Sequence, residues 1–97
     1  MIVSFGDRPT EALYHGIRGK AVKRFPPQIL TVAVRKLDML NSAGTLQDLL
    51  SPPGNRLEAL RGDLKGLHSV RINDQWRIVF RWEAGHAHEV RVLDYHH

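Results

Sequence analysis

One stretch of the chain has the hydrophobic spacing of a long amphipathic helix. Apolar side chains recur there every three or four residues, at Ile29, Leu30, Ala33, Val34, Leu37 and Leu40. Pro26 and Pro27 suit the first turn, and the segment 41–44 should end the helix. A shorter helix is expected over residues 10–15, with Asp7 as its cap and Gly16 at its end. Thr45 to Asp48 resembles a capping box for one more short turn.

From residue 57 onward the hydrophobic period changes from helical to two, which is typical of strands. Strands are expected at residues 68–72, 76–82 and 89–95, and a short opening strand at residues 2–5. In the 76–82 strand one face carries Trp76, Ile78, Phe80 and Trp82, and the other carries Arg77, Val79 and Arg81. His86 and His88 lie beside a turn glycine and match no standard zinc spacing, so we expect a solvated hairpin tip and no metal.

Short turns between consecutive strands favour antiparallel pairing. The pattern therefore predicts an α+β fold, with two N-terminal helices on one face of a mainly antiparallel sheet of three to five strands. The arginines would lie on the other face. A length of 97 residues indicates a single domain over residues 1–97.

Composition limits the kinds of chemistry and location. The chain has no cysteine, which excludes thiol nucleophiles and cysteine zinc sites. It has no signal-peptide pattern and no apolar run of the ~20 residues that span a membrane. We therefore expect a cytoplasmic protein with no membrane partner.

The charge favours a nucleic-acid partner. Lys and Arg number 14 against 10 Asp and Glu, for a net charge of +4, and ten of the cations are arginine. The planar guanidinium matches phosphate geometry. An ordinary basic surface remains an equally valid interpretation of the charge alone.

The C-terminus combines a carboxylate, a phenol and an imidazole. Alternation places Asp94 and His96 on the same side of the last strand, about 6.6 Å apart at ~3.3 Å per residue. A carboxylate near an imidazole orients it and favours its protonated form, which suits a general acid. Tyr95 would point the other way unless the terminus twists. From spacing alone, a terminal strand that frays into solvent, or an affinity-tag remnant at His96 and His97, is the more common explanation of such residues.

Arginines on neighbouring strands could supply a phosphate site. Arg77 and Arg81 share a face, and with Arg71 and Arg91 they could form a cationic surface of the kind that phosphoryl transfer needs. A solvated face with cross-strand ion pairs is the alternative.

Several segments together resemble a known family. These are the Arg-Phe-Pro-Pro sequence at 24–27, "PPGNRLEALRGD" at 52–63, "HSVRINDQWRIVFRW" at 68–82 and the terminal "DYH" at 94–96. They resemble the HigB toxins of the RelE/ParE superfamily, also called plasmid maintenance system killer proteins. The resemblance spans nearly the whole chain, in order.

The resemblance implies a compact RelE-like fold and a toxin of a type II toxin-antitoxin system. The implied activity is that of a ribosome-dependent endoribonuclease, an mRNA interferase that cleaves translated mRNA in the ribosomal A site without metal or cofactor. The implied partners are the ribosome, mRNA and a HigA-like helix-turn-helix antitoxin.

The resemblance also implies site residues. Asp94, Tyr95 and His96 match the family's C-terminal catalytic motif, and Arg77 matches its strand arginine. Arg61 occupies the basic position before Gly-Asp, and with Arg71 and Arg81 it is a candidate for RNA binding. Well-studied relatives have a histidine where this chain has Glu58, which makes Glu58 the candidate partner base.

Two other functions fit the same sequence. One is a ParE-like toxin that inhibits gyrase and has no nuclease activity, since one fold can serve different targets. The other is a non-catalytic RNA-binding module that uses the arginine face.

Overall fold

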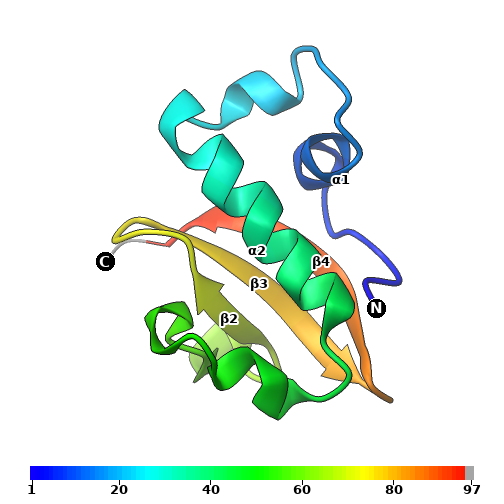
Figure 1. Cartoon of the computed structure of the whole chain (residues 1–97), viewed down its shortest axis with the longest axis vertical. Helices are drawn as coiled ribbons and strands as arrows, with labels where there is room; N and C mark the ends of the chain where they lie inside the picture. Colours follow the sequence, from blue (N-terminus) through cyan, green and yellow to red (C-terminus); the bar gives the residue numbers. More distant parts are fainter. Residues whose placement is uncertain (96–97) are drawn as a thin grey trace.

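The computed structural model describes residues 1–95 and has an antiparallel sheet at its centre (Figure 1). The strands are β1 (Glu58–Ala59), β2 (His68–Arg71), β3 (Trp76–Glu83) and β4 (His86–Asp94). Their order in the sheet is β1-β2-β3-β4, and every neighbouring pair is antiparallel. The predicted α+β class and antiparallel sheet are confirmed, with four strands.

The two predicted helices are present. Helix α1 (Arg8–Tyr14) begins after Asp7, whose side chain accepts a hydrogen bond from the Thr10 amide. Helix α2 (Leu30–Ser42) follows a single 3₁₀ turn, η2 (Pro27–Ile29). The predicted capping box at Thr45 is confirmed, since it opens the 3₁₀ segment η3 (Leu46–Leu50). The other 3₁₀ turns are η1 (Val22–Arg24), η4 (Pro53–Asn55) and η5 (Gly62–Leu64).

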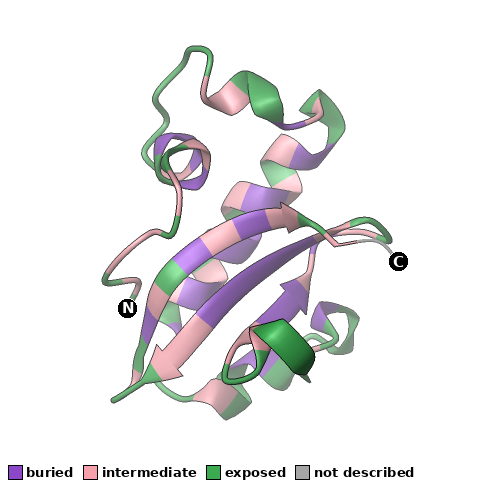
Figure 2. Ribbon diagram, turned by 180° about the vertical axis from the view of Figure 1, so that it is seen from behind, coloured by how far each residue is buried: buried purple, intermediate pink, exposed green. Residues whose placement is uncertain are grey.

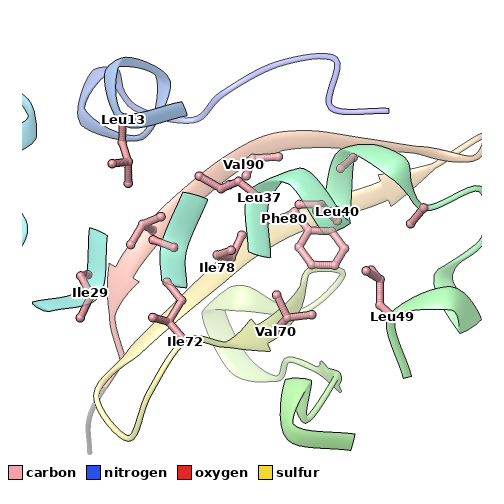
Figure 3. Packing of buried hydrophobic residues seen from close by; sticks show 14 of the residues in the cluster. Leu13, Ile29, Leu37, Leu40, Leu49, Val70, Ile72, Ile78, Phe80 and Val90 are labelled. Carbon is pink, nitrogen blue, oxygen red and sulfur yellow. The ribbon is translucent and has the colours of Figure 1, made fainter. Parts of the chain in front are cut away.

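The main core lies between α2 and one face of the sheet (Figure 3). Leu37 and Leu40 of α2 are fully buried, as are Ile78 and Phe80 of β3. Burying side chains of this size is worth about 1.5–3 kcal/mol each, which makes this interface the principal source of stability. No helix within residues 1–95 is both long and apolar enough to cross a membrane.

The prediction that both helices cover one face is correct for α2 only. Helix α1 lies beside the outer edge of β4, where the Thr10 hydroxyl accepts a 2.9 Å hydrogen bond from the Val92 amide. Residues 2–5 lie along the same edge and make two isolated parallel bridges, Ile2 to Ala87 and Phe5 to Val90, instead of a strand. These segments use the hydrogen-bonding groups that an edge strand would expose.

The predicted last strand was too short at its start. It begins at His86, which is exposed beside the hairpin turn as expected, whereas Ala87 is fully buried and is not part of a solvated tip. One extra residue enters β4 opposite Phe80, and Glu89 has a φ of 54°. Such a bulge shifts the alternation by one, which lets both Ala87 and Val90 face the core.

The arginine face of the sheet is also partly covered. Arg77 and Val79 are both buried, although they alternate with the core residues of β3. Viewed from the side opposite α2, the segment containing β1 and η5 lies in front of the sheet (Figure 2). Leu60 of this segment is buried. A thin layer of chain therefore covers part of the second face of the sheet, and Arg77 lies at the border of that layer.

Candidate active site

Arg77 is the most buried arginine of the sheet and is held by several acceptors. Its Nε donates to Ser69 Oγ at 2.7 Å, and its Nη2 donates to the carbonyl oxygen of Arg56 at 2.6 Å. The side chain is only 8% exposed. A planar donor with its stem and Nε fixed in this way presents the remaining N–H groups in one direction.

Glu58 provides the nearest negative charge, with its Oε1 3.5 Å from Arg77 Nη2. Burial lowers the pKa of Arg77, and Glu58 and then Tyr95 act in the opposite direction. An arginine pKa starts so high that the guanidinium stays charged at neutral pH. Glu58 itself is about half exposed, so solvent and substrate can reach its carboxylate.

These groups surround an open polar cleft of about 210 Å³. It is lined by Arg56, Glu58, Arg71, Asn73, Asp74, Arg77 and Tyr95. Arg71 and Arg77 stand directly opposite each other on β2 and β3, an arrangement that is unfavourable for like charges alone. Asp74 forms an ion pair with Arg71, and Glu58 pairs with Arg77, which offsets the repulsion. The cleft therefore holds three arginines, two of which have exposed acidic partners, a setting that suits a phosphate.

Tyr95 lies on the Arg77 side of the sheet. The centre of its ring is 5.9 Å from the Arg77 Cζ, within the range of a cation–π contact. Arg77 pairs with Leu93, and alternation from Leu93 places Tyr95 on the same face without any twist of the terminus. Asp94 falls on the opposite face, where its Oδ2 accepts a hydrogen bond from Gln75 Nε2 at 2.9 Å.

The loop before β1 is fixed by a buried polar pair that no sequence motif indicated. Asn55 is fully buried, and its Nδ2 donates to the carbonyl oxygens of Leu49 at 3.1 Å and Ser51 at 3.3 Å. Its Oδ1 accepts a hydrogen bond from the ammonium group of Lys36 on α2. Burial lowers the pKa of Lys36, and the nearby Arg35 and Arg71 add to this. Arg56 follows in the left-handed region, with φ 44°, and presents its carbonyl to Arg77.

Two of the predicted RNA-binding arginines do not line the cleft. Arg81 forms ion pairs with Glu83 and Glu89 near the β3–β4 hairpin, and Arg61 is an exposed residue just before η5. The predicted catalytic His96 lies outside the described residues. Among residues 1–95 no cluster of three or more His, Asp or Glu side chains is suitable for a metal ion.

The fold is one that toxins of bacterial toxin-antitoxin pairs use. The structure of the YoeB-YefM complex from Staphylococcus aureus has a chain that aligns with 100% of this one over 99% of its own length, with a TM-score of 0.60 and 16% identity. A second structure, of the heterotetrameric YoeB-YefM complex from the same organism, aligns equally well. At this identity the likeness concerns the fold alone.

Sequence similarity defines the family. Residues 4–96 match the HigB-like toxin family, described as the RelE-like toxin of the type II toxin-antitoxin system HigB. Toxin HigB-1 of Vibrio cholerae serotype O1 is 40% identical over 87 residues, which is 90% of both chains. An uncharacterized protein of Haemophilus influenzae is 33% identical over 78 residues, 80% of this chain and 76% of its own. The chain therefore belongs to the HigB-like toxin family, and it is a type II toxin.

Proposed function

We propose that this toxin is a ribosome-dependent endoribonuclease that cleaves translated mRNA in the ribosomal A site. The observation that carries the proposal is the buried Arg77 guanidinium, aimed into a polar cleft that Glu58 and Tyr95 also line. Family membership supplies the reaction class. In the cell the toxin would be neutralised by a HigA-like helix-turn-helix antitoxin, in keeping with the toxin-antitoxin complexes of its structural relatives.

The proposed reaction is transesterification within the RNA chain. The ribose 2′-oxygen loses its proton to a base and attacks the adjacent phosphorus, forming a new P–O bond. The bond to the 5′-oxygen of the next nucleotide breaks, and that oxygen takes a proton from an acid. The products are a 2′,3′-cyclic phosphate and a 5′-hydroxyl, and no external co-reactant is consumed.

The cleft residues can divide these roles. Arg77 would neutralise the charge that develops on the non-bridging oxygens, and Arg71 would assist from the opposite strand. Glu58 is the candidate base because its carboxylate is accessible and borders the cleft. His96, one residue beyond Tyr95, is the candidate acid, and the Tyr95 hydroxyl would position the phosphate.

Dependence on the ribosome follows from how few groups the cleft contains. Holding the mRNA with its 2′-oxygen, phosphorus and 5′-oxygen in line can lower the activation barrier by ~7–11 kcal/mol. The ribosome would supply that alignment, and free RNA would be cleaved poorly.

Mapping mRNA 5′ ends on translating ribosomes tests the proposal. The purified wild type should give cleavage within A-site codons and 5′-hydroxyl ends, whereas the Arg77→Ala and His96→Gln variants should not. If the mRNA stays intact and the toxin instead stops DNA supercoiling by gyrase, the gyrase-inhibitor function is favoured. Salt-sensitive RNA binding without any cleavage product would favour a binding module.

A further inference from the structure

A second concave surface is formed by residues 18–30, which connect α1 to the start of α2, away from the candidate active site. It is a cleft of about 310 Å³ whose lining is mainly apolar and includes Val22, Phe25, Pro27 and Leu30. None of its lining residues is shared with the polar cleft around Arg77. In Figure 1 this connection between α1 and α2 lies above the sheet, and β2 lies at the other end of α2.

The cleft continues in both directions. Arg18 and Gly19 also line a neighbouring hollow of about 210 Å³ that includes Ile17, which is 53% exposed. Leu30 also lines a shallower depression with Thr31 and Val34 on the exposed side of α2. Together these hollows form a strip into which apolar side chains of a partner can pack.

Positive charge is concentrated along the same strip. The segment 16–24 contains Arg18, Lys20, Lys23 and Arg24 and no acidic residue. These four charges equal the net charge of the whole chain, so cations and acids balance elsewhere. Cations at the rim of an apolar groove attract a partner with acidic residues beside its apolar anchors.

The sheet edges favour a helical partner over an added strand. The outer edge of β4 is occupied, since the Val3 and Gly6 amides donate to the carbonyl oxygens of Ala87 and Val90, both at 2.9 Å. The other edge strand, β1, has only two residues. Binding of one face of an amphipathic helix in a groove is therefore favoured over addition of a strand to the sheet.

From these observations we infer that the cleft in the connection between α1 and α2 is the docking site for an acidic amphipathic helix of the antitoxin. The inference rests on the proposed antitoxin partner. The apolar lining favours a protein ligand over RNA, which would require polar and stacking contacts with its bases and phosphates. Because the two clefts share no residue, an antitoxin bound here would leave the Arg77 cleft uncovered by this helix.

The test uses the product of the reading frame adjacent to the toxin's own, purified and titrated against toxin variants. The Lys20→Glu/Lys23→Glu double variant should bind at least 10-fold more weakly at low salt, with a smaller loss at high salt. Val22→Asp should increase the dissociation rate at least 100-fold. Lys65→Glu reverses an exposed cation outside the cleft and should change affinity less than 2-fold.

Ribosome-dependent cleavage is measured on the same variants without the partner. Unchanged affinity in the double variant, whose lysines are both exposed, would overturn the docking site even if Val22→Asp fails to fold. Reduced cleavage with unchanged affinity for the partner would instead assign the strip to ribosomal RNA. If the wild-type toxin does not bind the partner at all, both the partner and the docking site are refuted. Absence of cleavage by the wild type, with affinity lost in the variants, would refute only the nuclease function.

Discussion

The Arg77 guanidinium donates a 2.6 Å hydrogen bond to the carbonyl oxygen of Arg56, 21 positions earlier in the chain. This bond ties the centre of the sheet to the loop that precedes β1. Arg56 can present its carbonyl in this direction because it adopts a left-handed backbone conformation directly after the buried Asn55. The orientation of the candidate catalytic arginine thus depends on a loop that is itself anchored to α2 through Lys36.

Asn55→Ala should reduce both stability and cleavage. The substitution removes the hydrogen bonds that Asn55 makes with the carbonyl oxygens of Leu49 and Ser51 and with the Lys36 ammonium group. An orphaned buried group costs ~1–3 kcal/mol, so we expect a loss of about 3 kcal/mol. For a chain of this size the melting temperature should fall by roughly 15 °C, as measured by circular dichroism.

The matched control is Asn41→Ala, which removes one hydrogen bond from the Ile2 amide and none near the cleft. It should lower stability less and leave cleavage by the folded protein unchanged. If Asn55→Ala cleaves mRNA as fast as the control at a temperature where both are folded, the loop does not position Arg77.

Arg77→Lys should lower ribosome-dependent cleavage by about 10²–10³-fold, the cost of losing one preorganised donor to a developing oxyanion. Lysine keeps the charge but cannot donate to Ser69 Oγ and the Arg56 carbonyl while also facing the cleft. Single-turnover cleavage on programmed ribosomes measures the effect. Arg81→Lys, on the same face but paired with Glu83 and Glu89, should stay within about 3-fold of wild type. Equal losses in both variants would show that the face contributes only general positive charge.

The elements with strong local patterns could be predicted from sequence. In β3, Ile78 and Phe80 alternate with charged residues, and α2 carries an unbroken apolar stripe, so each element follows from its own residues. Alternation also places Tyr95 on the Arg77 face, opposite to Asp94. Periodicity identifies which residues share a face. It does not reveal that Val79 would be buried on the second face, because the covering segment comes from elsewhere in the chain.

Other features depend on contacts that no local pattern encodes. The bulge at Glu89 follows from the register between β3 and β4, and it alone allows Ala87 to be buried. Asn55 stands in a Pro-Gly loop where an exposed turn residue is the usual expectation, and Lys36 is one of many helix lysines. Their partnership becomes visible only when α2 and η4 are placed side by side.

Glu58→Gln should lower ribosome-dependent cleavage about 10²-fold. The glutamine is isosteric but cannot accept the 2′-hydroxyl proton. Stability should change little, because the Glu58 side chain is about half exposed and its pair with Arg77 is long, at 3.5 Å. Glu83→Gln, also exposed, is the control and should leave the cleavage rate unchanged. Cleavage by Glu58→Gln at the wild-type rate would assign the base to another group.

Asp48 should make the fold acid-sensitive. Hydrogen bonds from the Thr45 amide and then the Gly44 amide hold the pKa of Asp48 below its usual value. Because the folded pKa is lower than the unfolded one, the stabilisation is complete above about pH 4 and is lost as pH falls through the folded value. Melting temperatures of wild type and Asp48→Asn should differ at pH 7, and the difference should shrink as the pH falls below about 4. A constant gap between the two would show that the carboxylate charge contributes nothing.

Truncation after Tyr95 should separate folding from catalysis. The shortened chain retains the pairing of Asp94 with Trp76 and the 2.6 Å hydrogen bond from the Tyr95 amide to the Gln75 carbonyl, so β4 should remain intact. Its melting temperature should stay within a few degrees of wild type. Cleavage on ribosomes should fall by at least 10²-fold, because the candidate acid, His96, is removed while the Arg77 cleft persists. Restoring His96 alone, in a chain that ends at that residue, should recover cleavage, and failure of this rescue would place the acid elsewhere.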